Sequence, residues 1–283
     1  MPEIFRNPRT RFAPSPTGRM HLGHAYSALL AWQAAGFDAD RFLLRIDDID
    51  SSRCKDEFTD QIMDDLQWLG ISWNQPPLYQ SARSQRYNAA LEWLESEKLV
   101  YPCYLSRKEY EASLAAPQNS PNSLPALSTA PRQTTVPALR LDMDRALAQI
   151  KQKYQPLIWQ THTGELITAD PRPLGNVVLG RRNSPASYHL SVVLDDADSQ
   201  IDLVVRGDDL RASTDLHCLI QTLLSLPSPL YYHHELIYDE SGQRLAKRDN
   251  ARSLSTYREN GLTIDDVKSL IPHIKPSERA NFS

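Results

Sequence analysis

The first hundred residues alternate between strand-like and helix-like patterns, and this alternation restricts the fold more than any other feature of the sequence. A short strand over Thr10–Ala13 is followed by helical apolar spacing from Leu22, and Arg41–Asp47 has the pattern of a buried strand. Two further helical stripes follow, one ending at Gly70 and one containing Tyr87. Strands that alternate with helices favour a parallel sheet. We therefore expect an α/β fold with a doubly wound, Rossmann-type sheet.

This alternation stops after about Leu99. Residues 111–137 contain five prolines and many Ser, Ala and Asn residues without any period, which predicts a long loop. Strand-like runs return at Tyr188–Leu194 and Ile201–Val205, and an amphipathic helix is predicted at Thr214–Leu224. An insertion is therefore expected to interrupt the sheet domain.

We divide the chain into four segments on these grounds. They are residues 1–98, the first half of the sheet domain; 99–185, the insertion with its loop; 186–240, the second half of the sheet domain; and 241–283, a loop rich in Arg and Lys followed by a short helical tail. No internal repeat is found.

Composition excludes several classes of protein. The 283 residues are 41% hydrophobic and 23% charged, as in ordinary globular proteins, and no apolar run is long enough to span a bilayer. The N-terminus lacks the pattern of a secretory signal. The three scattered cysteines, Cys54, Cys103 and Cys218, favour a reducing cytoplasm over a disulfide framework. A net charge of −4 excludes a generally cationic surface, although a local basic face could still contact nucleic acid.

The most specific motif is the fourteen-residue string from Arg11 to His24, RFAPSPTGRMHLGH. It lies where a strand ends and a helix begins, which is where open parallel sheets bind nucleotides. Backbone N–H groups at a helix start attract phosphate, and His21 and His24 can donate hydrogen bonds to phosphate oxygens. Because Gly23 has no side chain, an adenine ring can lie against the backbone there. The alternative is that both histidines are ordinary polar residues at a helix start, but chance matches become rare as a motif lengthens.

A second motif, RLAKR at Arg244–Arg248, lies in the last forty residues. A lysine on a flexible loop can close over a triphosphate, and Lys247 could neutralise charge in this way. Short basic runs are more often solvated surface, so the motif gains weight only from its combination with the first.

Together these motifs resemble those of the class I aminoacyl-tRNA synthetases. HLGH matches the HIGH motif of that class, and RLAKR is a variant of its KMSKS loop. The strings RFAPSPTG, RIDDID (45–50) and VRGD (205–208) narrow the resemblance, which runs from about Arg11 to Asn250, to the glutamyl branch. A full glutamyl-tRNA synthetase continues into a large helical anticodon-binding domain, whereas this chain ends at Ser283. We therefore expect a member of the family of glutamyl-Q tRNA(Asp) synthetases. The resemblance implies that residues 99–185 are an insertion like the acceptor-binding insertion of that branch.

The resemblance implies roles for particular side chains. His21, Gly23, His24 and Lys247 would bind ATP, and the two histidines and the lysine would be catalytic. The residues implied to bind glutamate are Arg11, Phe12, Ala13, Pro14, Ser15, Asp47, Tyr188 and Arg206. Among them an arginine can hold a carboxylate in a bidentate fork, and the aspartate would contact the α-ammonium group.

Two of these assignments have alternatives. Arg206 could instead form a surface ion pair with Asp208 or Asp209. Tyr188 could instead be an ordinary core aromatic. The tandem His233-His234 lacks the spacing of a metal site, so we expect it at the surface or facing tRNA.

The sequence departs from the family pattern in three places. Asp47 stands where the family usually has the longer glutamate, and Ala246 and Arg248 replace two serines of the KMSKS loop. The family often binds zinc in the insertion through several cysteines and a tyrosine, whereas Cys103 is the only cysteine between residues 99 and 185. One thiolate cannot complete the usual tetrahedral set, so we expect no zinc.

The resemblance implies a two-step reaction that needs ATP and Mg²⁺. Glutamate is first activated to glutamyl-adenylate and then transferred to queuosine in the anticodon loop of tRNA(Asp). We expect a cytoplasmic monomer with no membrane partner. Three alternatives remain: a trimmed glutamyl-tRNA synthetase that charges tRNA(Glu), a nucleotidyltransferase that shares the HIGH motif, and a non-catalytic tRNA-binding paralogue.

Overall fold

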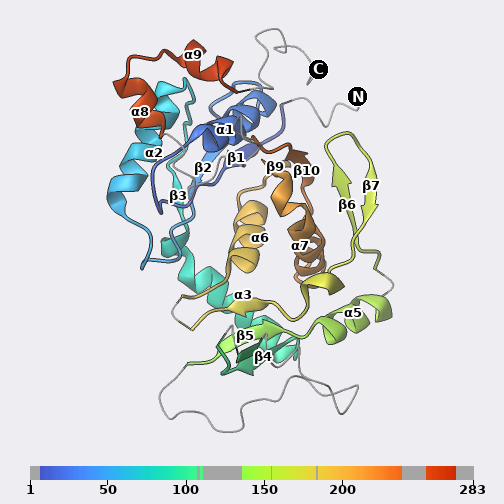
Figure 1. The fold of residues 1–283 in the computed structure, drawn as a ribbon. Coiled ribbons are helices and arrows are strands. Elements are labelled where there is room, and N and C mark those ends of the chain that lie inside the picture. The colour runs from blue at the N-terminus through green and yellow to red at the C-terminus, as the bar shows by residue number, and fades with distance from the viewer. Residues whose placement is uncertain are drawn as a thin grey trace.

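A mostly parallel sheet built from distant parts of the chain organises the fold (Figure 1). This computed structural model describes residues 7–106, 109–110, 136–153, 155–182, 184–237 and 253–271. The strands of the sheet are β1 (Thr10–Phe12), β2 (Phe42–Ile46), β3 (Leu78–Tyr79), β6 (Ile158–Thr161), β7 (Leu166–Thr168), β9 (Leu203–Gly207) and β10 (Leu230–His234). They run in the order β3-β2-β1 and β9-β10-β6-β7, and every paired strand is parallel to its neighbour except β7. The Arg9 carbonyl joins the two parts by accepting from the backbone N–H groups of Asp202 and Leu203.

Helices pack on this sheet and on one another. Their bounds are α1 (Leu22–Ala34), α2 (Asp56–Trp68), α3 (Ser84–Ser96), α6 (Tyr188–Asp198), α7 (Arg211–Leu223), α8 (Leu254–Glu259) and α9 (Ile264–Ser269). Helix α1 packs on β1 and β9, whereas α7 packs on β6. The predicted doubly wound α/β class and the strand–helix alternation of the first hundred residues are confirmed.

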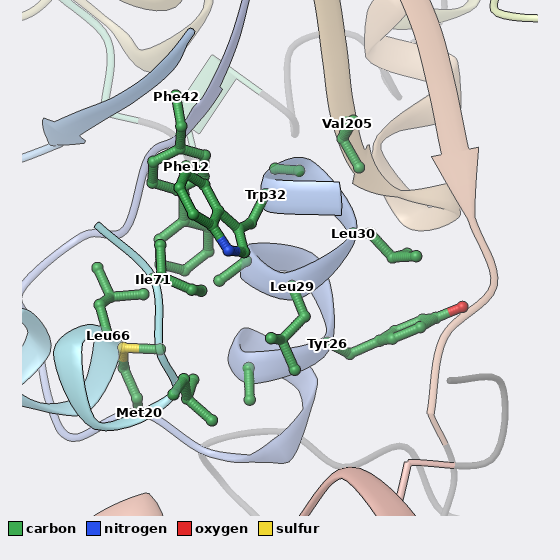
Figure 2. Packing of buried hydrophobic residues seen from close by; sticks show 14 of the residues in the cluster. Phe12, Met20, Tyr26, Leu29, Leu30, Trp32, Phe42, Leu66, Ile71 and Val205 are labelled. Atoms are coloured by element: carbon green, nitrogen blue, oxygen red, sulfur yellow. The ribbon is translucent and has the colours of Figure 1, made fainter. Parts of the chain in front are cut away.

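Two large apolar clusters form the core. The first lies between α1, α2 and the sheet, where the Trp32 ring meets Phe42 edge-on at a centroid distance of 5.4 Å, with Phe12 and Leu66 beside them (Figure 2). The second joins α3, α6 and α7 around fully buried side chains such as Tyr87 and Leu190.

The predicted insertion contains a small antiparallel sheet. Its strands are β4 (Val100–Cys103), β5 (Ala138–Leu141) and β8 (Val178–Gly180), accompanied by α5 (Met143–Gln152). Figure 1 shows this sheet at the end of the molecule far from α1. Residues 158–168 belong to the same segment of sequence, yet they form the β6–β7 hairpin that extends the central sheet. The predicted loop over 111–137 lies outside the described residues except for its last two.

The strand predicted at Tyr188–Leu194 is wrong, because these residues form the first turns of α6. Leu190 to Asp196 are all buried, since α6 packs against other helices on several sides. A helix that is buried all round has no polar stripe, so its apolar run has the same pattern as that of a buried strand.

No helix in the described ranges is long and apolar enough to cross a membrane.

A buried carboxylate on α6 joins three elements. Asp195 is fully buried and accepts from Gln80 Nε2 at 2.8 Å, Arg83 Nε at 2.6 Å and Tyr87 Oη at 2.9 Å. Gln80 and Arg83 belong to the short 3-10 helix at Gln80–Arg83, and Tyr87 belongs to α3. Burial and the neighbouring carboxylate together raise the pKa of the Tyr87 hydroxyl far above its usual value, so Tyr87 remains a donor.

We predict that Asp195→Ala lowers the free energy of unfolding by about 3 kcal/mol, because it leaves several buried donors without an acceptor. Urea unfolding measures the change. Asp64→Ala, on the exposed side of α2, is the matched control and should cost less than about 0.5 kcal/mol. A loss for Asp195→Ala as small as that of the control would contradict this role.

Candidate active site

A cavity of about 450 Å³ lies at the carboxyl ends of β1, β2 and β9, beside the first turn of α1. Most of the predicted site residues line it: Arg11, Phe12, Ala13, His21, Gly23, His24, Asp47, Tyr188 and Arg206. Pro14 and Ser15 are not part of the lining; the Pro14 carbonyl accepts from the Asp47 N–H at 2.9 Å, and Ser15 is exposed. Lys247 lies outside the described residues.

The two histidines of HLGH cap helix α1. The Nδ1 atom of His21 accepts from the Gly23 N–H at 3.1 Å, and the Nδ1 atom of His24 accepts from the His21 N–H at 3.2 Å. A ring nitrogen that accepts carries no proton, so each neutral ring has its proton on Nε2. The rings lie 3.8 Å apart between centroids. The helix start thus fixes both imidazoles as Nε2 donors at the edge of the cavity.

The described residues on either side of the segment that contains Lys247 both lie at this site. Ile237, just before residues 238–252, lines the cavity. Just after them, Ser253 forms a β-bridge with His21, and the Leu254 N–H donates to the Met20 carbonyl at 2.9 Å.

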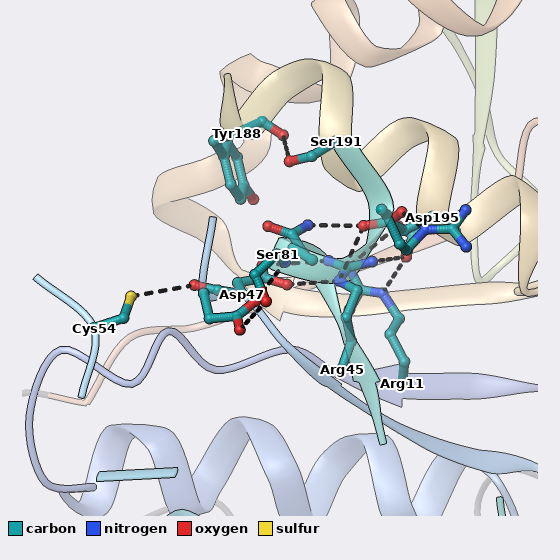
Figure 3. Close-up of polar contacts among 12 residues, drawn as sticks. Arg11, Arg45, Asp47, Cys54, Ser81, Tyr188, Ser191 and Asp195 are labelled. Atoms are coloured by element: carbon teal, nitrogen blue, oxygen red, sulfur yellow. Dashed lines mark hydrogen bonds and ion pairs between the residues drawn. The ribbon is translucent and has the colours of Figure 1, made fainter. Parts of the chain in front are cut away.

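An ionic cluster forms one wall of the cavity (Figure 3). Arg45 Nε donates to Asp47 at 2.6 Å and Arg45 NH1 to Asp196 at 2.6 Å, while Arg11 Nε donates to Asp196 at 3.0 Å. Arg11 NH1 lies 3.3 Å from the Val205 carbonyl. The guanidinium of Arg11, expected to hold a substrate carboxylate, is therefore already paired with a protein carboxylate.

Burial and ion pairing act in opposite directions on the acids of this cluster. Burial raises the pKa of Asp47 to about 6, against the lowering effect of Arg45. Burial also acts to raise the pKa of Asp196, but Arg11 and Arg45 together outweigh it and hold that pKa below its ordinary value. Asp47 is thus the acid of the cluster that can change its charge near neutral pH.

Sequence reasoning missed Arg45, Asp195 and Asp196 as parts of the site. A signal existed for each: Arg45 is a charged residue within a buried strand, and the two acids directly follow the apolar run of α6. Charged residues in such places are seldom buried unless they are paired. The sequence does not tell which residues pair.

Arg206, at the end of β9, contacts no carboxylate in the described part of the chain. Its guanidinium donates to Thr214 Oγ1 at 2.7 Å, to His217 Nδ1 at 3.2 Å and to His233 Nε2 at 3.4 Å. The alternative of a surface ion pair is wrong, because Arg206 is 6% exposed and Asp208 pairs with Arg211.

Tyr188 is the first residue of α6 rather than of the predicted strand. It is half-buried, and it both lines the cavity and packs against the apolar cluster of α3, α6 and α7. The packing against this cluster fits the alternative of a core aromatic, while the place of Tyr188 at the cavity leaves its glutamate-binding role a prediction.

The expectation that His233 and His234 lie at the surface is wrong. His234 is 4% exposed and its Nε2 lies 2.7 Å from Ser27 Oγ, while half-buried His233 contacts Thr214. Both belong to β10, an inner strand between β9 and β6, which explains their burial. Burial, with Arg206 next, lowers the pKa of His233 to about 3.

Cys103 ends β4 and is buried. Arg182 donates to the carbonyls of Tyr104 and Leu105 just after it, the latter at 2.9 Å. Within the described ranges, no group of three His, Cys, Asp or Glu side chains could hold a metal ion.

Comparison with known proteins shows the family of the chain. Residues 8–267 match the family model of the class I tRNA synthetases (E and Q), catalytic domain. The chain is 46% identical over 277 residues to a glutamyl-Q tRNA(Asp) synthetase of Rhodobacter capsulatus, covering 93% of this chain and 99% of that protein. It is 37% identical to a protein of the same name from Nocardia farcinica, covering 92% of this chain and 82% of that protein.

The chain belongs to the class I aminoacyl-tRNA synthetases of the glutamyl and glutaminyl branch, within the glutamyl-Q tRNA(Asp) synthetase family. It is therefore a ligase of a class that uses ATP. A glutamate–tRNA ligase of Synechococcus sp. strain WH7803 is 35% identical, but the chain covers only 56% of it. Among solved structures, a glutamate tRNA ligase of Elizabethkingia meningosepticum shares the fold, with a TM-score of 0.70 at 22% identity over 94% of this chain and 61% of that one.

We predict that His21→Asn separates helix capping from catalysis in this synthetase. Asparagine is a good N-cap but has no donor at the position of Nε2, so stability should match the wild type. Formation of the aminoacyl-adenylate, measured by pyrophosphate exchange, should fall about 100-fold. His21→Ala should lose this activity and also about 1 kcal/mol of stability. Full activity in His21→Asn would contradict the catalytic role, and equal destabilisation by both changes would contradict the capping role.

Proposed function

We propose that the chain activates glutamate with ATP and transfers the glutamyl group to queuosine in the anticodon loop of tRNA(Asp). The observation that carries this proposal is the juxtaposition, in one cavity, of the donor-bearing start of α1 and the buried cation Arg206. The first suits phosphate and the second suits a carboxylate. Activation of an amino acid with an acidic side chain needs both.

The glutamate would lie between the ionic cluster and Arg206. Asp47 would accept from its α-ammonium group, and Arg206 would bind its side-chain carboxylate, with the Tyr188 hydroxyl as a further donor. Arg11 is paired with Asp196, so it would contribute positive potential rather than bind the substrate carboxylate in a bidentate fork. Asp47 is one methylene shorter than the glutamate usual in the family, so a water could bridge its contact to the ammonium group.

ATP would lie across the first turn of α1, with its adenine against Gly23 and its phosphates near His21 and His24. The substrate α-carboxylate attacks the α-phosphorus and pyrophosphate leaves; a tRNA hydroxyl then attacks the activated carbonyl and AMP leaves. We assign Lys247 to the phosphates, because both borders of its segment lie at the cavity. Positioning and charge stabilisation would supply the rate enhancement, without a covalent enzyme intermediate.

Mg²⁺ would arrive with the ATP, because it usually keeps several waters and binds substrate phosphates rather than a cage of protein ligands. A structural zinc does not fit the chain. Cys103 has no other cysteine nearby in sequence, and the described residues offer no group of three metal-binding side chains. We propose a monomer that works without zinc.

The acceptor is proposed from the family. Two relatives that the chain covers over 99% and 82% of their length bear the name glutamyl-Q tRNA(Asp) synthetase, whereas it covers 56% of the glutamate–tRNA ligase above.

The test is ATP-dependent transfer of labelled glutamate to tRNA pools with and without queuosine, followed by fragment mapping. We expect label on the anticodon fragment of tRNA(Asp), and only in the queuosine-containing pool. Label at the 3′ end of tRNA(Glu) would instead assign the chain to translation. Pyrophosphate exchange without label in either pool would support the activation step and overturn the proposed acceptor.

The pKa of Asp47 predicts a pH dependence for glutamate activation. Because the pKa of about 6 is raised, the carboxyl becomes neutral as the pH falls through that value and can no longer pair with the α-ammonium group. The kcat/KM for glutamate should therefore fall about tenfold per pH unit below pH 6. Asp47→Asn should have a lower kcat/KM at neutral pH and lack this limb of the profile. A limb that persists in Asp47→Asn would show that another group causes it.

A further inference from the structure

Arg206 lines the cavity, and within the described part of the chain only neutral groups hold its guanidinium. Arg206 is 6% exposed, and its three hydrogen bonds within the described part of the chain go to a threonine hydroxyl and two imidazoles, those of Thr214, His217 and His233. The Tyr231 ring lies 5.2 Å from its guanidinium carbon. In the described part of the chain, no carboxylate oxygen lies within 4.0 Å of this guanidinium.

The hydrogen bonds determine where the protons lie. A guanidinium can only donate, so His217 Nδ1 must accept from Arg206 and must carry its proton on Nε2. That proton points to His189 Nδ1 at 3.2 Å. Thr214 Oγ1 accepts from Arg206 and donates to His233 Nε2 at 2.9 Å. All three imidazoles are therefore neutral, because a proton on any of the three accepting nitrogens would break its hydrogen bond.

Burial of these rings also favours their neutral forms. Burial, reinforced by Arg206, lowers the pKa of His189 to about 4 and lowers the pKa of His217 well below its usual value. Neither ring gains a proton that would compete with the positive charge of Arg206.

The other two arginines of the cavity differ from this one. Arg11 and Arg45 share the carboxylates of Asp47 and Asp196, so their charges are compensated within the protein. A buried cation without a counter-ion is unfavourable, and an anion that enters the cavity relieves that cost. Three of the five N–H donors of Arg206 are used, which leaves one on each terminal nitrogen for a bidentate carboxylate.

We propose that His217 and Thr214 are positioning residues for substrate selection. They hold Arg206 in place without supplying a negative charge, so that the side-chain carboxylate of glutamate is preferred over the neutral amide of glutamine. Any acidic residue at position 217 or 214 would act as an internal competitor for the substrate. This inference rests on the proposed activation of glutamate.

The test compares two variants of nearly equal shape and different charge. His217→Gln keeps an uncharged acceptor near Arg206, whereas His217→Glu places a carboxylate there. We expect the KM for glutamate in pyrophosphate exchange to be at least about tenfold higher in His217→Glu than in His217→Gln, with kcat within about twofold. Binding of glutamine, measured by calorimetry, should change much less, so that the preference for glutamate over glutamine narrows in His217→Glu.

A second pair of variants and a control pair distinguish an effect on glutamate binding from a loss of folding. Thr214→Asn and Thr214→Asp repeat the comparison from the other side of Arg206, and melting temperatures identify any variant that does not fold. His162→Gln and His162→Glu form the control, because His162 is a half-buried histidine that contacts Tyr232 and does not contact Arg206. The control pair should have the same KM.

The outcomes separate this inference from the proposed function. Equal KM values within the 217 pair and within the 214 pair would overturn the inference alone, and show that these residues act only through packing. If one pair fails to fold, the folded pair decides. Failure of the wild type to bind glutamate would overturn the proposed function and this inference with it.

Discussion

The cavity depends on the buried ion pairs of Arg45 and Arg11 with Asp196. Arg45 lies on β2 and Arg11 on β1, whereas Asp196 lies on α6, more than 140 residues later in the chain. Buried ion pairs add little net stability, because desolvation offsets much of the attraction. Breaking one is costly, however, since it leaves a buried charge without a partner. The cluster therefore fixes how α6 meets the first half of the sheet, and with it the position of Tyr188 at the cavity.

Two kinds of electrostatic environment meet in this cavity. On one wall, arginines and aspartates compensate one another, and Asp47 is the acid whose pKa lies close to neutrality. Elsewhere in the lining, the guanidinium of Arg206 has neutral hydrogen-bond partners in the described part of the chain. An amino acid with both an ammonium group and a side-chain carboxylate complements this arrangement. The first turn of α1, with its hydrogen-bond donors, lies beside the same cavity, where the phosphates of ATP would be needed.

The local parts of this arrangement could be predicted from the sequence. The string from Arg11 to His24 contains its own strand end, turn and helix start, so its motif indicated both the fold class and the place of the cavity. The contacts between residues far apart in the sequence could not be predicted. Nothing in the order of residues tells that Asp196 pairs with Arg11, or that His217 lies against Arg206. Burial on all sides concealed the helix at Tyr188, and the inner position of β10 reversed the expectation for His234.

A structure of the protein with a non-hydrolysable glutamyl-adenylate analogue tests the central claim most directly. The account predicts that the side-chain carboxylate lies about 3 Å from the terminal nitrogens of Arg206, with the ammonium group toward Asp47 and the adenine against Gly23. An analogue bound with its carboxylate on Arg11 in place of Asp196, or bound outside this cavity, would contradict it.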